Sequence, residues 1–261
     1  MRYLHLAGLY LRISVLNELQ YRSNFWVQLF QSVLSLLVAL GGLAIVYGHT
    51  ESLNGWNSSE LLVIVAVYFL IGGVIRTVIQ PNMQKLMEDI RLGTLDYIII
   101  KPVEVQFLIS VRQVQIWRVM DFFIGVALLL VGVAQIGEPI PLVDALGFLL
   151  LLTCGALIVY SFWLMLATIT FWFIKIDNIL VIFETMYEAG RWPVRIYPGW
   201  LEVVLTFLVP VAFAITVPVE ALTGRLDSQT ILLALALAGA LLYLSHRFWR
   251  IGIRAYSGAS A

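Results

Sequence analysis

Two glutamates and one arginine within largely apolar sequence are the residues whose types and spacing could act on a charged ligand. Glu184 and Glu188 are four residues apart, so a helix would place both carboxylates on one face. Arg76 closes another apolar segment. Ionisable side chains at membrane depth are costly and often mark a substrate pathway, so these three residues form a candidate translocation path. The alternatives are that the glutamates lie at a hydrated edge or pair with Arg191, and that Arg76 extends to lipid headgroups.

Other chemistry finds little support in the chain. The histidines His5, His49 and His246 are scattered without the spacing of zinc ligands. Ser161 is not in a nucleophile elbow, and Cys154 is the single cysteine, so it cannot form an internal disulfide. The phosphate-binding sequence G-x-x-x-x-G-K-[ST] does not occur. We therefore expect no catalytic residue, metal or cofactor in this chain.

The composition predicts a membrane protein. Hydrophobic residues make up 61% of the 261 residues and charged residues only 12%, too few for an ordinary water-exposed surface. A chain of this length can supply about six crossings of about 20 residues each, with little left for a soluble domain. We predict one all-α polytopic membrane domain over residues 1–261. The formal net charge is zero, which gives no indication of a nucleic-acid partner.

Apolar runs separated by polar turns predict the helices. Residues 1–23 have the periodicity of an amphipathic helix lying in the membrane interface. Clear spans are expected near residues 24–47, 61–79, 119–136, 145–173 and 231–246. The fourth of these is longer than a bilayer requires, so we expect it to be tilted.

The positions of lysine and arginine orient these spans, because basic residues are retained on the cytoplasmic side. Most of them lie in the amino-terminal segment, between the second and third spans, and in the carboxyl-terminal tail. The loops at residues 48–60 and 137–144 contain acids such as Glu51, Glu138 and Asp144 but no lysine or arginine. We therefore predict cytoplasmic termini and an even number of crossings, one of them supplied by the residues between the fourth and last spans.

Two positions are open for this fifth crossing. Hydropathy favours residues 200–219, which would leave the preceding basic residues inside. However, Pro210 and Pro218 interrupt that segment, so it also resembles a broken hairpin that enters the membrane partway and is buried against protein. The crossing would then lie near residues 176–192.

The charged segment between the second and third spans, residues 80–105, has helical periodicity. Its apolar face comprises Met83, Leu86, Met87 and Ile90, and its charged face comprises Lys85, Glu88, Asp89 and Arg91. Gly93 provides a helix stop. The pattern predicts a short helix at the inner membrane edge that binds a cytoplasmic partner, with its charges directed to water or to that partner. An ordinary connector resting on lipid headgroups is the alternative.

Two segments resemble a known family. The sequences DIRLGTLDYIIIKPV (residues 89–103) and RWPVRIYPGWLEVVLTFLVPVAFAITVPVEAL (residues 191–222) are similar to those of type-2 ATP-binding-cassette (ABC) exporter permeases, and the resemblance extends over nearly the whole chain. It implies an interfacial amino-terminal helix, six spans, a coupling helix within residues 80–105 and an external re-entrant hairpin at residues 193–222. It therefore favours the hairpin interpretation and a fifth crossing near residues 176–192.

The resemblance also implies a function. It is closest to bacterial permeases of the cytoplasmic membrane that act beside a second, similar permease and a separate cytoplasmic ATPase, which would bind ATP and Mg²⁺. The segment from Met83 to Arg91 would occupy a cleft of that ATPase, and spans two and five would line the path. The rivals are a self-contained secondary transporter or channel, and a membrane anchor for a cytoplasmic complex. The first needs ionisable residues in several spans and often an internal repeat, and neither is clear in this sequence.

Overall fold

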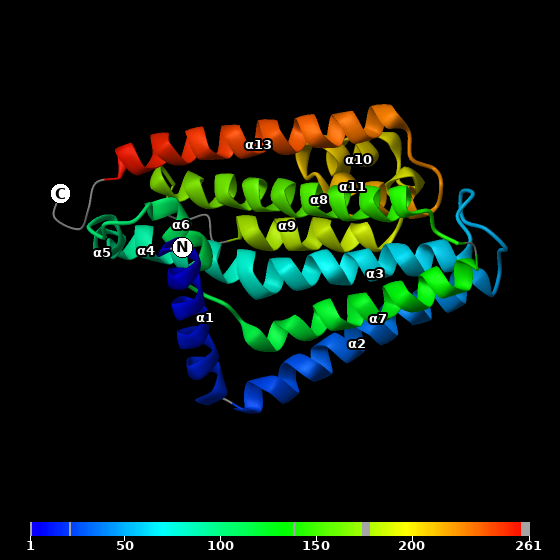
Figure 1. Ribbon diagram of the computed structural model, residues 1–261, viewed down its shortest axis with the longest axis horizontal. Helices are drawn as coiled ribbons and strands as arrows, with labels where there is room; N and C mark the ends of the chain where they lie inside the picture. The colour runs from blue at the N-terminus through cyan, green and yellow to red at the C-terminus, as the bar shows by residue number, and fades with distance from the viewer. Residues whose placement is uncertain (1, 21, 138, 174–177, 257–261) are drawn as a thin grey trace.

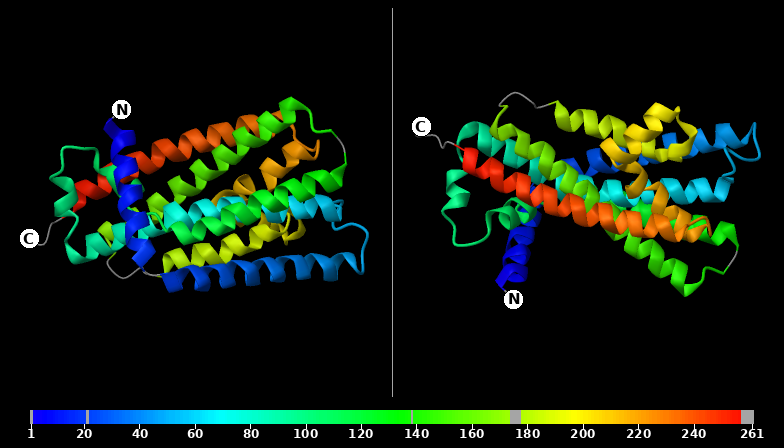
Figure 2. Two further views of the ribbon diagram at one scale, coloured as in Figure 1. Left: turned by 60° about the horizontal axis from the view of Figure 1, so that its bottom comes forward. Right: turned by 90° about the horizontal axis from the view of Figure 1, so that it is seen from above.

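The computed structural model describes residues 2–20, 22–137, 139–173 and 178–256. They form a bundle of long helices lying side by side, with the first helix running across one end of it (Figures 1 and 2). The longer helices are α1 Arg2–Gln20, α2 Arg22–Tyr47, α3 Ser58–Val74, α4 Gln80–Leu92, α7 Val119–Ile136, α8 Leu142–Thr168, α9 Ile179–Glu188 and α13 Ser228–Ala255. The shorter α-helices are α5 Asp96–Ile99, α6 Val105–Val111, α10 Gly199–Val203, α11 Val211–Ala214 and α12 Thr216–Leu222. Single π or 3-10 turns are η1 Ile75–Ile79, η2 Ile116–Arg118, η3 Ile169–Phe171, η4 Ala189–Arg191, η5 Val194–Ile196 and η6 Val204–Leu208. The all-α prediction is confirmed for these described parts of the chain.

Five helices of the described residues are long and apolar enough to cross a membrane. They are Ser23–Tyr47, Ser58–Leu92, Ile116–Ile136, Leu142–Phe171 and Ser228–Ala255. Each contains or overlaps one of the five clear predicted spans, and the last extends well beyond its predicted bounds. Many large apolar side chains on α2, α8 and α13 are exposed on the outside of the bundle, as expected for a lipid-facing surface. The chain is therefore a multi-pass membrane protein.

The second span does not end where the charged segment begins. Residues Ser58–Leu92 form one helix of 35 residues, about 52 Å long at 1.5 Å per residue, whereas the bilayer core is about 30 Å thick. The charged segment thus continues from the second span as α4, and its position at the membrane edge stays a prediction. Pro81 has no N–H to donate to the carbonyl of Thr77, and the π-helical turn η1 lies just before this proline. The Thr77 carbonyl instead accepts a 2.9 Å hydrogen bond from Gln115 N.

Helix α3 is the centre of the bundle, and α7 packs along it at very short range. An added Cβ on Gly125 would lie 2.6 Å from the backbone nitrogen of Leu70 and 2.9 Å from the carbonyl oxygen of Ala66. An added Cβ on Gly73 would lie 2.7 Å from the backbone nitrogen of Phe122. Small residues thus let the two helix backbones approach each other, a common way of packing helices in membranes.

We expect Gly125→Ala to destabilise the bundle by about 1–3 kcal/mol, because its methyl group must displace the backbone of α3. Thermal unfolding of the purified protein in detergent measures the effect. Gly239→Ala on α13 is the matched control, since nothing lies within 4 Å of an added Cβ there. Equal midpoints for the two variants would show that α3 and α7 do not need this close contact.

The segment before α13 bends back within the bundle. Helical stretches Gly199–Leu208 and Val211–Leu222 meet at 66°. An added Cβ on Gly155, halfway along α8, would lie 2.8 Å from Ala214 Cα, so the middle of the segment lies deep in the bundle. Its two ends meet, because Arg195 Nη2 lies 3.7 Å from Glu220 Oε1. The segment therefore enters the bundle and returns to the end from which it came.

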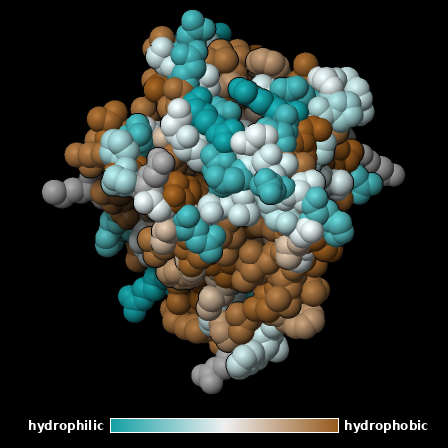
Figure 3. Space-filling model, turned by 90° about the vertical axis from the view of Figure 1, so that its right-hand side faces the viewer, coloured by the Kyte–Doolittle hydropathy of each residue, from teal (hydrophilic) through white to brown (hydrophobic). Residues whose placement is uncertain are grey.

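That end of the molecule is held by a second ion pair. Glu60 forms a capping box with Asn57 at the start of α3, and Arg225 Nη2 lies 2.8 Å from both Glu60 carboxylate oxygens. The Arg225 guanidinium also covers the Trp56 ring at 4.5 Å. Hydrophilic residues gather over this end while apolar side chains surround it (Figure 3). The pair joins the turn after the bent segment to the beginning of the central helix.

Replacing Arg225 with glutamine is expected to cost about 1–3 kcal/mol of stability, because it leaves the buried Glu60 carboxylate without its cation. Arg195→Gln should change stability by less than about 1 kcal/mol, since the Arg195 side chain is 70% exposed and its Nη2 lies 3.7 Å from Glu220, beyond hydrogen-bond distance. Thermal unfolding in detergent compares the two variants. A larger loss for the Arg195 variant would contradict this assignment.

Candidate functional site

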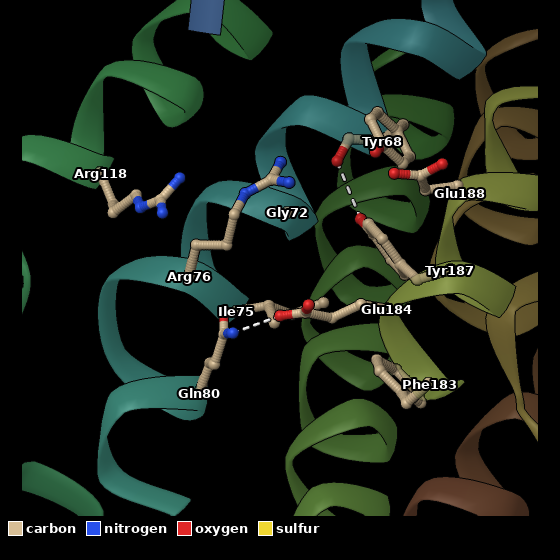
Figure 4. A pocket seen from close by; sticks show the side chains of 10 residues that line it. All are labelled: Tyr68, Gly72, Ile75, Arg76, Gln80, Arg118, Phe183, Glu184, Tyr187 and Glu188. Carbon is tan, nitrogen blue, oxygen red and sulfur yellow. Dashed lines mark hydrogen bonds between the residues drawn. The ribbon is translucent and has the colours of Figure 1, made fainter. Parts of the chain in front are cut away.

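The three residues predicted to line a path lie in one pocket between the central helix and α9 (Figure 4). The pocket has a volume of about 250 Å³. It is lined by Tyr68, Gly72, Ile75, Arg76, Gln80, Arg118, Phe183, Glu184, Tyr187 and Glu188. The continuous helix Ser58–Leu92, called the central helix below, supplies Arg76 from its π turn η1. The turn η2 supplies Arg118, and α9 supplies both glutamates. The structure therefore brings together side chains from three separate parts of the sequence.

Arg76 is held inside the bundle by an acid that the sequence analysis did not single out. Its Nε lies 2.9 Å from Oδ2 of Asp121 on α7, and Ser32 Oγ of α2 donates a 2.5 Å hydrogen bond to Asp121 Oδ1. Asp121 is buried. The alternative that Arg76 extends to lipid headgroups is therefore wrong. The sequence does contain a signal for this ion pair, because Asp121 is a lone aspartate in an apolar span and such residues are rare unless they are paired.

The carboxylates of α9 have a different environment. Glu184 accepts a hydrogen bond from the neutral side chain of Gln80, and no ion pair joins Glu188 to another residue within the described part of the chain. Arg191, the alternative partner, instead lies 5.0 Å above the Tyr68 ring and donates to the Tyr68 hydroxyl at 3.2 Å. The predicted alternative of a pair between the glutamates and Arg191 is not formed.

Two buried tyrosines fix the position of α9. Tyr187 Oη donates a 2.8 Å hydrogen bond to the backbone carbonyl of Tyr68, and the two rings are stacked with centroids 5.0 Å apart. Phe183, one turn earlier on α9, is also buried. This contact holds the α9 backbone, and therefore Glu184 and Glu188, at a defined distance from the central helix. Neither tyrosine had been identified from the sequence.

Two further cavities share lining residues with this pocket, and a third shares one with the second of them. The first cavity, of about 210 Å³, shares Glu184 with the pocket and extends toward α4. The second, of about 180 Å³, shares Arg76, Arg118 and Glu188 with the pocket and reaches α2. A cavity of about 200 Å³ shares Arg191 with the latter and is otherwise mainly apolar. Together the four cavities follow α3 and α9 along most of the bundle.

The charged segment packs differently from its prediction. Met83, Leu86 and Met87 are buried within this chain, and α4 contacts α6 and α8. The expectation that this apolar face anchors a partner is therefore not supported by the packing. Asp89, expected to face water or a partner, is also buried: it pairs with Arg112 and accepts a 2.7 Å hydrogen bond from Thr94 Oγ1.

Exposed apolar residues instead occur on both sides of the helix stop at Gly93, which has the left-handed φ of 70° that favours glycine. Tyr97 is 71% and Ile100 78% exposed. We call this surface the exposed tip; it comprises Leu92, Tyr97, Ile99 and Ile100, with Arg91 and Lys101 exposed beside it. Residues 83–91 of the predicted contact segment thus mostly pack within the fold, and the exposed tip begins directly after them.

A buried amide connects α4 to the start of the third span. Asn82 is fully buried; its Nδ2 donates to the carbonyls of Val78 and Gln113 at 2.7 Å, and its Oδ1 accepts from Gln113 N at 3.0 Å. Gln113 precedes η2, which carries Arg118 of the pocket. Hydrogen bonds of Asn82 thus join α4 to the segment that leads into η2.

A bundle of apolar helices around an internal charged pocket, with one helix longer than the bilayer is thick, defines a multi-pass membrane protein. The chain belongs to the ABC-2 family of transporter proteins, because the model of that family matches residues 33–260. No curated protein and no solved structure matches the chain. Membership makes it the membrane subunit of an ABC transporter and implies association with a cytoplasmic ABC ATPase.

Proposed function

We propose that this chain is a permease subunit of an ATP-driven exporter in the bacterial cytoplasmic membrane. One observation carries the proposal: the helix Ser58–Leu92 lines the charged pocket along one part and leads directly into the exposed tip. A single continuous element can thus connect a substrate site to an ATPase outside the membrane. ATP and Mg²⁺ are bound by that partner.

Six crossings follow if α9 is the fifth and residues 193–222 form an external hairpin. The short α9 and η4 continue into residues 192–198, of which Pro193 and Val194 are buried, so their irregular backbone is covered by protein. The end of the bundle with α4 and the last turns of α13 carries most of the basic residues and is the cytoplasmic end. Both termini are then cytoplasmic, with α1 in the membrane interface.

The exposed tip is the surface that binds the ATPase. Leu92 lies about 51 Å along the helix from Ser58 at 1.5 Å per residue, well beyond a core of about 30 Å, so the tip is in water and not among lipid tails. Exposed apolar residues flanked by basic ones have the composition of a protein interface. Nucleotide-driven closure of the ATPase moves the tip, and Asn82 and the central helix convey that movement to the pocket.

A second permease, either another copy or a similar paralogue, completes the path. Support comes from the pocket itself, because Glu188 is exposed at the side of this single chain. An exposed carboxylate at that depth requires water or a protein partner. Spans two and five, Ser58–Leu92 and α9, face this shared path.

Reconstitution tests the proposal. Proteoliposomes containing the permease and its ATPase should transport substrate only with ATP, and transport should stop when the ATPase is omitted. A self-contained secondary transporter is the second candidate, favoured by the gathering of ionisable residues from the central helix, α7 and α9. Flux by the permease alone, driven by an ion gradient, would establish that candidate and refute ours.

A further inference from the structure

The charges of the pocket are separated by sign. Guanidinium groups come from the central helix and η2, whereas carboxylates come from α9 on the opposite wall (Figure 4). Arg76 is already neutralised by Asp121. The charges left for a ligand are Glu184 and Glu188 on one wall and Arg118 on the other, with Arg191 in the adjoining cavity.

None of these four residues forms an ion pair with another described residue. Arg118 contacts the neutral Gln31 at 3.5 Å, and Arg191 contacts Tyr68 and Ser35, which are also neutral. Glu184 accepts from the amide of Gln80. Separated charges of both signs are costly at membrane depth unless a partner of opposite charge meets each of them. A ligand with one cation and one anion would meet both walls at once.

The surroundings indicate that such a ligand also has an apolar part. Val181 of α9 is exposed and lines the cavity of about 210 Å³. The cavity next to Arg191 is lined mainly by apolar residues. An apolar tail could therefore lie along α2 and α9 while the charged group enters the pocket.

We propose that the pocket binds the zwitterionic headgroup of an amphiphile, with its cationic group against Glu184 and Glu188 and its anionic group against Arg118 and Arg191. This inference rests on the proposed function, because it identifies the class of substrate. The pocket extends from Tyr68 to Gln80, about 15 to 33 Å along the helix from Ser58, and so lies in the inner half of the bilayer. The amphiphile accordingly enters from the inner leaflet.

Direct binding tests the inference without ATP. The purified full-length chain in an uncharged maltoside detergent is titrated with three fluorescent amphiphiles of identical tail, which carry a phosphocholine, a trimethylammonium or a phosphate headgroup. Fluorescence anisotropy should give about tenfold tighter binding of the phosphocholine probe than of either singly charged probe. Equal or weaker binding of the phosphocholine probe would overturn the inference.

Two substitutions test the acidic and the basic wall of the pocket separately. Glu188→Gln should weaken binding of the phosphocholine and trimethylammonium probes about tenfold without affecting the phosphate probe, and Arg118→Gln should weaken the phosphocholine and phosphate probes without affecting trimethylammonium. Glu51→Gln and Arg250→Gln are exposed controls outside the pocket and should change nothing. Neither pocket substitution breaks an ion pair between described residues. Competition by unlabelled amphiphiles on the unmodified protein gives the same ranking without any variant.

Failure here is distinguishable from failure of the proposed function. ATP-dependent flux with no preference for the phosphocholine probe would refute only the zwitterion inference. The expected binding pattern together with flux driven by an ion gradient alone would refute the ATP-driven mechanism and retain the headgroup site.

Discussion

Ile100→Asp is expected to reduce copurification of the ATPase subunit at least tenfold and to abolish ATP-dependent transport. Ile100 is the most exposed apolar residue of the tip, and a buried carboxylate in an interface costs free energy unless it is paired. The helix behind it should remain intact, because Met83 and Leu86 are packed within this chain. Pull-down of the ATPase and flux in proteoliposomes are the two measurements.

Leu142→Asp is the matched control for this change. Leu142 is also an exposed apolar residue, 75% exposed, but it begins α8 at the opposite end of the bundle. It should leave ATPase binding unchanged. If both variants bind the ATPase as well as the unmodified chain does, the tip is not the docking surface.

Asp121→Ala is expected to destabilise the protein by about 3–5 kcal/mol and to abolish transport, because it leaves the guanidinium of Arg76 without its ion pair inside the bundle. The change is destabilising because of desolvation: an unpaired cation inside the bundle costs more free energy than the ion pair contributes. Replacing both partners, Arg76→Met with Asp121→Leu, should recover most of the stability, since neither charge then remains. Thermal unfolding in detergent and ATP-dependent flux distinguish the two effects.

Transport should not recover in the double variant, because Arg76 also lines the pocket. A double variant that is less stable than either single variant would show that the two residues do not act as a pair. A double variant with full transport would show that Arg76 has only a structural role.

Several features were predictable from the sequence. The third predicted span, residues 119–136, coincides with α7 Val119–Ile136, because a long apolar run in a polar background can be satisfied only by burial in lipid or protein. The four-residue spacing of Glu184 and Glu188 likewise predicted a shared face, and α9 places both in the pocket. Composition and local periodicity were sufficient for these features, since each depends on neighbours within a few turns.

The partners of those residues required the tertiary structure. Asp121, which pairs with Arg76, and Tyr68, which stacks on Tyr187, are distant in sequence from the residues they contact. Hydropathy left two positions for the fifth crossing, and the contact between Arg195 and Glu220 shows that the ends of the hairpin segment meet. Only packing determines such pairings.

The charged segment shows the limit of sequence patterns most clearly. Periodicity correctly placed Met83, Leu86 and Met87 on one apolar face, so the sequence by itself determined that this face is buried. It could not determine whether another protein or the same chain buries it. The structure places α6 and α8 against α4 and leaves Tyr97 and Ile100 exposed. The hydrophobic effect requires that apolar area leave water but does not specify the surface that covers it, so that choice depends on the three-dimensional packing of the whole chain.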